Sequence, residues 1–323
     1  MNSDPKVSIV MPAYNVAPYV GETLAAVFAQ TFTDFEIIVV NDGSSDTEDL
    51  ERVLEPFKSR IRYFKQENLG AGAARNVALR AARGEFIAFL DADDLWLPNY
   101  LEEQLKFLQK ADCDLVCADA INIGRSPFTG RTFMEVLMPT APPTGTTTFL
   151  GLVSAKQSLV TSGVVARRQP IFDVGLFDES LRNSQDFDLW LRLVHSGARL
   201  AYQRRVLLRY RWHEGSLSGN EVNRNTRQLR VLRKIETDFD LDPAARKEVS
   251  RAIARRRAVL QFELGKVYLA EGEFDEARGS FAEARAASPN WKATVALWAS
   301  NISPRLIRSI YLRRTGKARE RVA

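Results

Sequence analysis

The chain has 323 residues, of which 45% are hydrophobic and 10% aromatic, a composition typical of a globular protein with a sizeable core. Its formal net charge is +5, but residues 301–323 hold seven basic residues and one acidic residue, so the remaining chain is near −1. A globular body without excess positive charge excludes nucleic-acid binding through a broad basic face.

Before residue 110 the chain alternates strand and helix patterns. Strands are predicted at 7–11, 35–40, 60–65 and 86–90, and helices are predicted at 17–30, 47–57 and 70–83. This alternation predicts βαβ units and a mostly parallel sheet flanked by helices, so the expected fold class is α/β. The Gly-x-Gly-x-x-Gly turn of dinucleotide-binding folds is absent after the first strand, which disfavours nicotinamide chemistry.

Three carboxylates, Asp91, Asp93 and Asp94, follow the predicted strand at 86–90. Ligands of open α/β sheets bind at the carboxyl ends of the strands. Three acids at this position repel one another unless positive charge lies among them, and a divalent metal with a phosphate-bearing ligand meets that need. The structural alternative is an acidic turn in which Asp94 caps the next helix.

Other strand ends carry groups that suit a nucleotide. Asp42, just beyond the second strand, is placed to accept a hydrogen bond from a base or a ribose. Tyr14, after Pro12 and Ala13, offers a ring on which a nucleobase can stack. Arg75 opens a helical turn from which it can reach a base or a phosphate. Each residue also has a purely structural alternative. Asp42 with Gly43 can form a common turn, Tyr14 can cover an edge of the protein, and Arg75 can be a solvated helix residue.

Four ordered segments, at 7–15, 37–46, 68–76 and 86–94, resemble glycosyltransferase family 2, whose members are inverting nucleotide-sugar enzymes with the Rossmann-like GT-A fold. The resemblance spans about residues 5–215. It implies that Asp91, Ala92 and Asp93 form the Asp-x-Asp motif, that Asp91 and Asp93 hold Mn²⁺ or Mg²⁺ with Asp93 as the direct ligand, and that Asp94 caps the following helix. It also implies a donor-binding set of Pro12, Ala13, Tyr14, Asn15, Asp42, Gly43 and Arg75.

The segment at 184–193 begins with polar residues and continues as an amphipathic helix. The resemblance implies that Asp186 is the base that deprotonates the acceptor hydroxyl, since inversion by direct displacement needs a single base opposite the leaving group. Gln185 stands where the family usually has Glu, so one carboxylate is lost. Asp188 lies two residues after Asp186, about 200° further around the helix, and is expected to face away from the site. The structural alternative is that Ser184 and Asp186 only cap the helix.

Three further segments complete the predicted acceptor side. His213 resembles a family motif after the last strand of the catalytic domain, which implies contact with the metal or the diphosphate; a structural role is the alternative. Residues 162–165 resemble the strand behind the acceptor cleft. Residues 124–147 are rich in Pro, Thr and Gly and predict a mobile loop over the site, or a plain connection.

The expected domains are a catalytic domain at 1–220, with a nucleotide-sugar half at 1–110 and an acceptor half at 111–220, and a helical region at 221–323. The helical region contains one hairpin that resembles a tetratricopeptide unit, at 250–289. Pro304 opens a helix whose apolar face carries Ile307, Ile310 and Tyr311. With the basic residues of 301–323, this helix would lie on anionic lipid at the inner face of the cell membrane, or dock on the protein.

The expected function is metal-dependent, inverting transfer of a sugar from a nucleotide-diphosphate donor to a glycan, lipid-linked or protein acceptor in surface polysaccharide or glycan biosynthesis. Asp42 and Tyr14 make a UDP-sugar the first expectation. A nucleotidyltransferase would need a Gly-rich, basic first loop, which this chain lacks. A non-catalytic scaffold is disfavoured by the acids that the motifs retain. With no signal peptide and only Cys113 and Cys117, we expect a reducing, cytoplasmic compartment.

Overall fold

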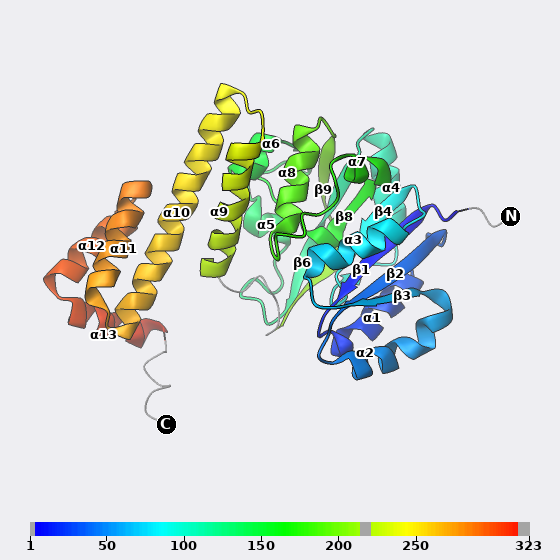
Figure 1. Ribbon diagram of the computed structural model, residues 1–323, viewed down its shortest axis with the longest axis horizontal. Coiled ribbons are helices and arrows are strands. Elements are labelled where there is room, and N and C mark those ends of the chain that lie inside the picture. The colour runs from blue at the N-terminus through cyan, green and yellow to red at the C-terminus, as the bar shows by residue number, and fades with distance from the viewer. Residues whose placement is uncertain (1–3, 214–220, 316–323) are drawn as a thin grey trace. The chain divides into compact units, whose positions relative to one another are not determined.

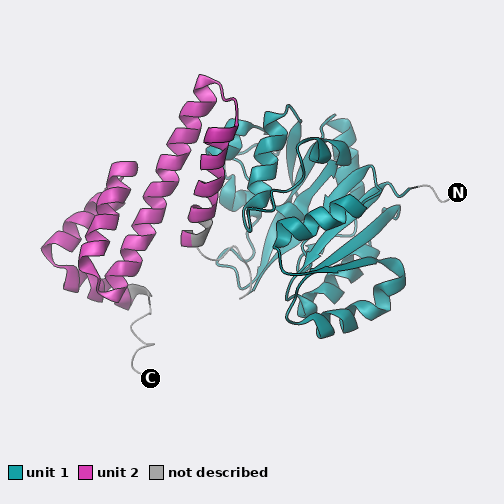
Figure 2. Cartoon of the chain, in the orientation of Figure 1, with its two compact units in different colours: residues 1–216 teal, residues 217–323 magenta. Residues whose placement is uncertain are grey.

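The computed structural model describes residues 4–213 and 221–315. The chain divides into two compact units, residues 1–216 and residues 217–323 (Figure 2). The domain boundary predicted at residue 220 lies outside the described residues.

The first unit is built on a nine-stranded sheet with the order β3-β2-β1-β4-β8-β6-β9-β5, in which β7 pairs with β9 (Figure 1). The first four strands in chain order are β1 (Val7–Ala13), β2 (Phe35–Asp42), β3 (Arg62–Gln66) and β4 (Phe86–Phe89). They pair in parallel, with β1 between β2 and β4, as the alternation of strands and helices predicts.

The other strands make the sheet mixed. They are β5 (Leu95–Trp96), β6 (Leu115–Gly124), β7 (Thr144–Thr147), β8 (Val164–Arg167) and β9 (Leu200–Trp212). Strand β8 runs antiparallel to both β4 and β6, whereas β6 and β9 are parallel. The predicted α/β fold class is therefore confirmed, with a parallel half that carries the first motifs and a mixed half that carries the rest.

The helices of this unit are α1 (Ala17–Phe28), α2 (Thr47–Leu54), α3 (Ala71–Ala81), α4 (Tyr100–Lys110), α5 (Phe133–Leu137), α6 (Phe149–Val153), α7 (Arg168–Asp173) and α8 (Gln185–His195). The segment predicted as a loop at 124–147 contains α5 and β7, so that prediction was wrong in part. A reciprocal capping box between Thr132 and Glu135 starts α5, and this local signal was present in the sequence.

The core lies along the central strands. Ile9, Val39 and Ile87, from β1, β2 and β4, are completely buried, and so is Leu79 of α3. Burying one such side chain contributes about 1.5 to 3 kcal/mol, so the sheet forms a firm base for the turns at its carboxyl edge. Cys117 is also buried and unpaired, and burial raises its pKa to about 12, so it is a core residue and not a metal ligand.

One carboxylate is buried at the amino end of the sheet. Glu36 of β2 accepts hydrogen bonds from the Ser8 hydroxyl, the Arg83 backbone N–H and the Arg62 guanidinium. Burial alone would raise the pKa of Glu36, but these donors outweigh it and hold the pKa below the ordinary value of 4.5. The charged form therefore stabilises the fold.

The second unit consists of α9 (Glu221–Asp238), α10 (Pro243–Glu271), α11 (Phe274–Ala287), α12 (Trp291–Ile302) and α13 (Pro304–Thr315). Helices α10 and α11 form the predicted hairpin. Gly265 permits their close approach, because a Cβ at this position would lie 2.6 Å from the Phe281 ring.

The helix predicted to begin at Pro304 is α13. Its residues Ile307 and Tyr311 pack against the cluster of Leu269, Ala277 and Phe281, so this side of the helix is docked on the protein. The last basic residues, within 316–323, lie outside the described residues. No helix in the described part of the chain has both the length and the apolar character that a membrane crossing requires.

Candidate active site

The parallel strands β1, β2 and β4 end at one edge of the sheet, and each is followed by a predicted donor-site residue. Tyr14 follows β1 and is about half exposed, Asp42 is the last residue of β2, and Asp91 lies two residues beyond the end of β4. Pro12 is half-buried, whereas Ala13 and Ala92 are buried in the supporting turns. The topology thus brings together turns that lie up to 77 residues apart in the sequence, from Tyr14 to Asp91.

The Asp42 carboxylate fastens the loop before α3. One of its oxygens accepts hydrogen bonds from the Leu69 backbone N–H and the Gln66 amide, and the other accepts from the Gly70 backbone N–H, at 2.7–2.9 Å. Gly43 is equally constrained. Its φ is +66°, and a Cβ there would lie 2.6 Å from the Asn68 backbone nitrogen. These two residues shape the rim of the site, and contact of Asp42 with a base stays a prediction.

The turn after β1 is tied to the turn after β2. The Asn15 side-chain oxygen accepts hydrogen bonds from the backbone N–H and the hydroxyl of Ser45, at 2.8 and 2.9 Å. Asn15 has a φ of +53°, a conformation that Asn tolerates better than most residues. The two turns therefore form one connected surface at the sheet edge.

A buried arginine balances the first acid of the Asp-x-Asp motif. Arg75 of α3 is 5% exposed, and its guanidinium pairs with the Asp91 carboxylate at 2.5 Å. Burial raises the pKa of Asp91 and the charges of Asp93 and Asp186 add to this, while Arg75 opposes the rise. The Nε of Arg75 is buried without a hydrogen-bond partner among the described residues. Arg75 thus supplies positive charge within the acidic cluster.

The second acid of the motif meets the predicted histidine. The Asp93 Oδ2 lies 2.9 Å from the His213 Nε2, and both side chains are about one-fifth exposed. The His213 ring stacks on Tyr19, with centroids 4.7 Å apart, which fixes its orientation. The contact joins the end of β4 to the segment after β9 across 120 residues of sequence.

This pair could hold a divalent cation through one carboxylate oxygen and one imidazole nitrogen. Two donors about 2.1 Å from one ion and at right angles to each other are about 3.0 Å apart, close to the observed separation. Within the described residues no group of three His, Cys, Asp or Glu side chains has a metal-binding arrangement, and Asp91 is engaged by Arg75. Asp93 and His213 would therefore supply two ligands and leave the others to phosphate oxygens and water, as is common for Mg²⁺.

Asp94 does not cap the next helix, so that prediction was wrong. Strand β5 intervenes, α4 begins at Tyr100, and the Asp94 carboxylate accepts a hydrogen bond from the Arg211 backbone N–H of β9 at 2.8 Å. Asp94 is completely buried. Burial raises its pKa well above the ordinary value, and Asp93 and Asp91 reinforce the rise. It holds β9, and hence His213, against the motif.

The predicted base lies at the start of α8. Asp186 accepts a hydrogen bond from the Thr161 hydroxyl at 3.0 Å and one from the Phe187 backbone N–H at 2.8 Å. Its charge acts on Asp91, which puts the carboxylate within electrostatic range of the motif. Ser184 takes the N-cap position with a φ of +58° and makes no side-chain capping bond, so the capping alternative fails for Ser184.

Its neighbours on α8 have other contacts. Gln185 is buried against Gly72 of α3, and a Cβ on Gly72 would lie 3.0 Å from the Gln185 side chain. Asp188 is completely buried and pairs with Arg192 at 2.7 Å, so it points away from the site, as its helical position predicts.

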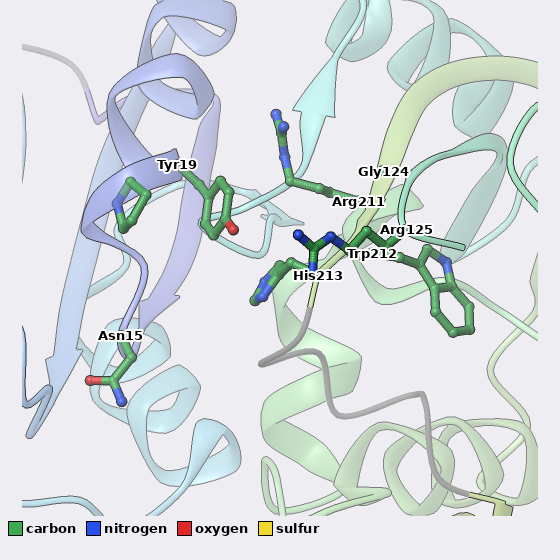
Figure 3. A pocket seen from close by; sticks show the side chains of 8 residues that line it. Asn15, Tyr19, Gly124, Arg125, Arg211, Trp212 and His213 are labelled. Atoms are coloured by element: carbon green, nitrogen blue, oxygen red, sulfur yellow. The ribbon is translucent and has the colours of Figure 1, made fainter. Parts of the chain in front are cut away.

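A cavity of about 450 Å³ has His213 in its lining (Figure 3). Its walls come from the turn after β1 together with the start of α1, from the end of β6, and from the end of β9. The lining residues are Asn15, Pro18, Tyr19, Gly124, Arg125, Arg211, Trp212 and His213.

Sequence reasoning missed the positive charge of this cavity. Arg211 donates to the Asp93 backbone carbonyl and to the Glu22 carboxylate, and its guanidinium lies over the Tyr19 ring. Arg211 lies two residues before His213 in the sequence, and this proximity could have indicated that Arg211 belongs to the site. Arg125 carried no such signal, because only the pairing of β6 with β9 brings it to the cavity.

Comparisons with known proteins agree with this fold. A crystal structure of residues 1–349 of TarS from S. aureus in complex with UDP-GlcNAc superposes with a TM-score of 0.65 at 18% identity, covering 96% of this chain and 92% of TarS 1–349. The mannosyltransferase PcManGT from Pyrobaculum calidifontis, in complex with GDP-Man and Mn²⁺, superposes with a TM-score of 0.62 at 19% identity, covering 96% and 85%. The chain therefore has the GT-A fold of nucleotide-sugar transferases, followed by helices.

Sequence comparison identifies the family. The family model described as "Glycosyl transferase family 2" matches residues 8–171. The UDP-Glc:alpha-D-GlcNAc-diphosphoundecaprenol beta-1,3-glucosyltransferase WfgD of Escherichia coli is 32% identical over 74% of this chain and 88% of its own length. This chain belongs to glycosyl transferase family 2. An uncharacterized glycosyltransferase of Rickettsia felis is 30% identical over 68% of the chain, which spans only 36% of that protein.

Proposed function

We propose that this protein is a metal-dependent, inverting glycosyltransferase that takes a sugar from a UDP-sugar and transfers it to a growing glycan. The observation that carries the proposal is the meeting, at one edge of the sheet, of the Asp93–His213 pair, the Arg75–Asp91 pair and the carboxylate of Asp186. The choice of UDP follows the name of the Escherichia coli relative and the ligand of TarS.

The donor would lie over the turns after β1 and β2. Tyr14 is exposed and can stack on a base, while the Asp42 carboxylate and Gly43 hold the rim in place. Arg75 keeps Asp91 paired, so that the acidic cluster does not repel a diphosphate. These residues bind and orient the nucleotide without taking part in bond breaking.

Asp93 and His213 would hold Mn²⁺ or Mg²⁺. When bound, such an ion supplies Lewis-acid stabilisation of the charge that develops on the departing nucleoside diphosphate. Tyr19 and Asp94 support the pair from outside, because Tyr19 stacks on the His213 ring and Asp94 holds the strand that leads to it.

Asp186 would remove the proton from the acceptor hydroxyl as that oxygen attacks the anomeric carbon. A base must present a fixed oxygen to the attacking group, and the Thr161 hydroxyl fixes the orientation of this carboxylate. The oxygen of the acceptor forms the new bond on the face opposite the leaving nucleotide, which inverts the anomeric centre.

The acceptor belongs, in this proposal, to a surface polysaccharide assembled on a lipid carrier. The Escherichia coli relative is named for a diphosphoundecaprenol-linked acceptor, and residues 301–323 carry a basic charge suited to an anionic membrane surface. An acceptor of this kind would place the enzyme at the inner face of the cell membrane.

The test is nucleotide release from a panel of UDP-, GDP-, dTDP- and CMP-sugars, with Mn²⁺, with Mg²⁺ and with EDTA. We expect release from a UDP-sugar that EDTA abolishes, and a loss of release in Asp93→Asn. Asp49→Asn, an exposed acid on α2, is the matched control and should behave as wild type. Release that is unaffected by EDTA and by Asp93→Asn would contradict the proposed metal site. Failure to bind any of the nucleotides with Mn²⁺ would contradict donor binding altogether.

A further inference from the structure

Helices α12 and α13 expose an unusual amount of apolar surface. The exposed side chains are Trp291, Val295, Trp298, Ile302, Leu306 and Ile310. They are six of the twelve large hydrophobic side chains exposed in the described residues, although these two helices are short. We call them the α12–α13 apolar surface. Isolated exposed hydrophobic residues are ordinary, but a concentration of them marks an interaction site.

The spacing shows that the exposure has a direction. On α12 the four apolar residues recur at intervals of four, three and four, which places them along one side of the helix. Ala293 and Ser300, on the opposite side, are buried. Helix α13 follows the same rule, because Ile307 and Tyr311 pack inward while Leu306 and Ile310 are exposed. The helices have therefore already buried one side and leave a second apolar side uncovered.

The charged residues of the segment that contains these two helices have a single sign. Residues 284–319 contain eight basic residues and no Asp or Glu. Lys292, Arg305 and Arg313 are exposed on the same two helices, whereas Arg308 turns inward and donates to the Ala270 carbonyl. A partner must therefore offer both an apolar layer and negative charge over an extended area.

We propose that the α12–α13 apolar surface docks on an anionic phospholipid bilayer. Tryptophan favours the boundary between acyl chains and headgroups, and Trp291 and Trp298 are 72% and 67% exposed. Helices that carry apolar residues on one side and basic residues around them lie in this boundary without crossing it. This membrane contact rests on the proposed function, in which the acceptor is linked to a lipid. It extends the contact from the basic residues 301–323 to an apolar surface that begins at Trp291.

The test is sedimentation of the full chain with vesicles of phosphatidylcholine, with or without phosphatidylglycerol. We expect binding only to the anionic vesicles, and a decrease with added salt. Trp291→Ala combined with Trp298→Ala should weaken binding by about tenfold, because each ring loses its buried apolar area. The control, Leu150→Ser with Val259→Ser, removes exposed apolar groups elsewhere and should bind as wild type. Lys292→Glu should weaken binding by about fivefold or more.

Equal binding of the tryptophan double variant and the control, or no binding of the wild type to anionic vesicles, would overturn the inference. A wild type that forms dimers at rising concentration, with a monomeric double variant, would also overturn it by assigning the surface to a second copy of the chain. Donor hydrolysis in solution separates this inference from the proposed function: the double variant should retain the wild-type rate. A wild type that hydrolyses the donor but does not bind anionic vesicles contradicts this inference alone, and a wild type that binds the vesicles but hydrolyses no donor contradicts the proposed function alone.

Discussion

Replacing Gly43 by Ala tests how the rim of the donor site is built. Two costs can be separated at this position. The first is conformational, because the φ of +66° costs a residue with a Cβ about 1 to 2 kcal/mol. The second is steric, because the new Cβ would lie 2.6 Å from the Asn68 backbone nitrogen, and such overpacking costs about 1 to 3 kcal/mol.

Gly197→Ala is the matched control. Gly197 has a φ of +93°, and a Cβ there meets nothing within 4 Å, so only the conformational cost applies. Thermal unfolding of both variants isolates the steric cost. We expect Gly43→Ala to melt about 4 to 8 °C below Gly197→Ala, because about 2 kcal/mol corresponds to such a shift in a domain of this size.

Nucleotide affinity provides the second readout. The loop that Gly43 touches is the loop that Asp42 holds through the Leu69 and Gly70 N–H groups. Displacing it should weaken UDP binding in Gly43→Ala and leave binding unchanged in Gly197→Ala, as measured by calorimetry. Equal melting temperatures for the two variants, or unchanged UDP affinity, would refute the claim that this close contact sets the position of the loop.

Three further predictions follow from single contacts. Thr161→Val should lower the rate of donor hydrolysis by about 10- to 100-fold without raising the KM for the donor, whereas Thr161→Ser should restore it, since Asp186 then keeps its hydrogen bond. Glu36→Gln should destabilise the fold at pH 7 by about 1.5 to 3 kcal/mol. Because the pKa of Glu36 is lowered in the fold, its contribution is present above pH 4.5 and is lost at lower pH, so the two melting temperatures should converge in acid. His213→Ala should remove the Mn²⁺-dependent part of UDP affinity, measured by titration with and without the metal, because Asp93 loses its partner.

The parallel half of the sheet was predictable because its signals are local. Apolar runs define β1, β2 and β4, and strands of one direction place their ends at one edge. The juxtaposition of Asp42, Asp91 and Tyr14 follows from that topology alone.

The mixed half was not predictable in this way. Strand β8 inserts antiparallel between β4 and β6, and no local pattern indicates this pairing. The prediction for Asp94 was wrong for the same reason. An acidic residue shortly before a helix is typical of an N-cap, and only the position of β9 in the sheet shows that the Asp94 carboxylate accepts a hydrogen bond from the Arg211 backbone N–H. Thr161 escaped notice because its role depends on a contact with Asp186 across 25 residues.

If Asp186 is the base of the glycosyl transfer, its loss should abolish the reaction without affecting the separate site that binds the donor. Donor hydrolysis and Mn²⁺-dependent UDP binding, measured together in Asp186→Asn, test it most directly. We expect Asp186→Asn to leave UDP affinity unchanged and to lower hydrolysis by about 100-fold or more, the range in which a general base contributes. Hydrolysis at the wild-type rate in Asp186→Asn, with UDP affinity intact, would contradict it.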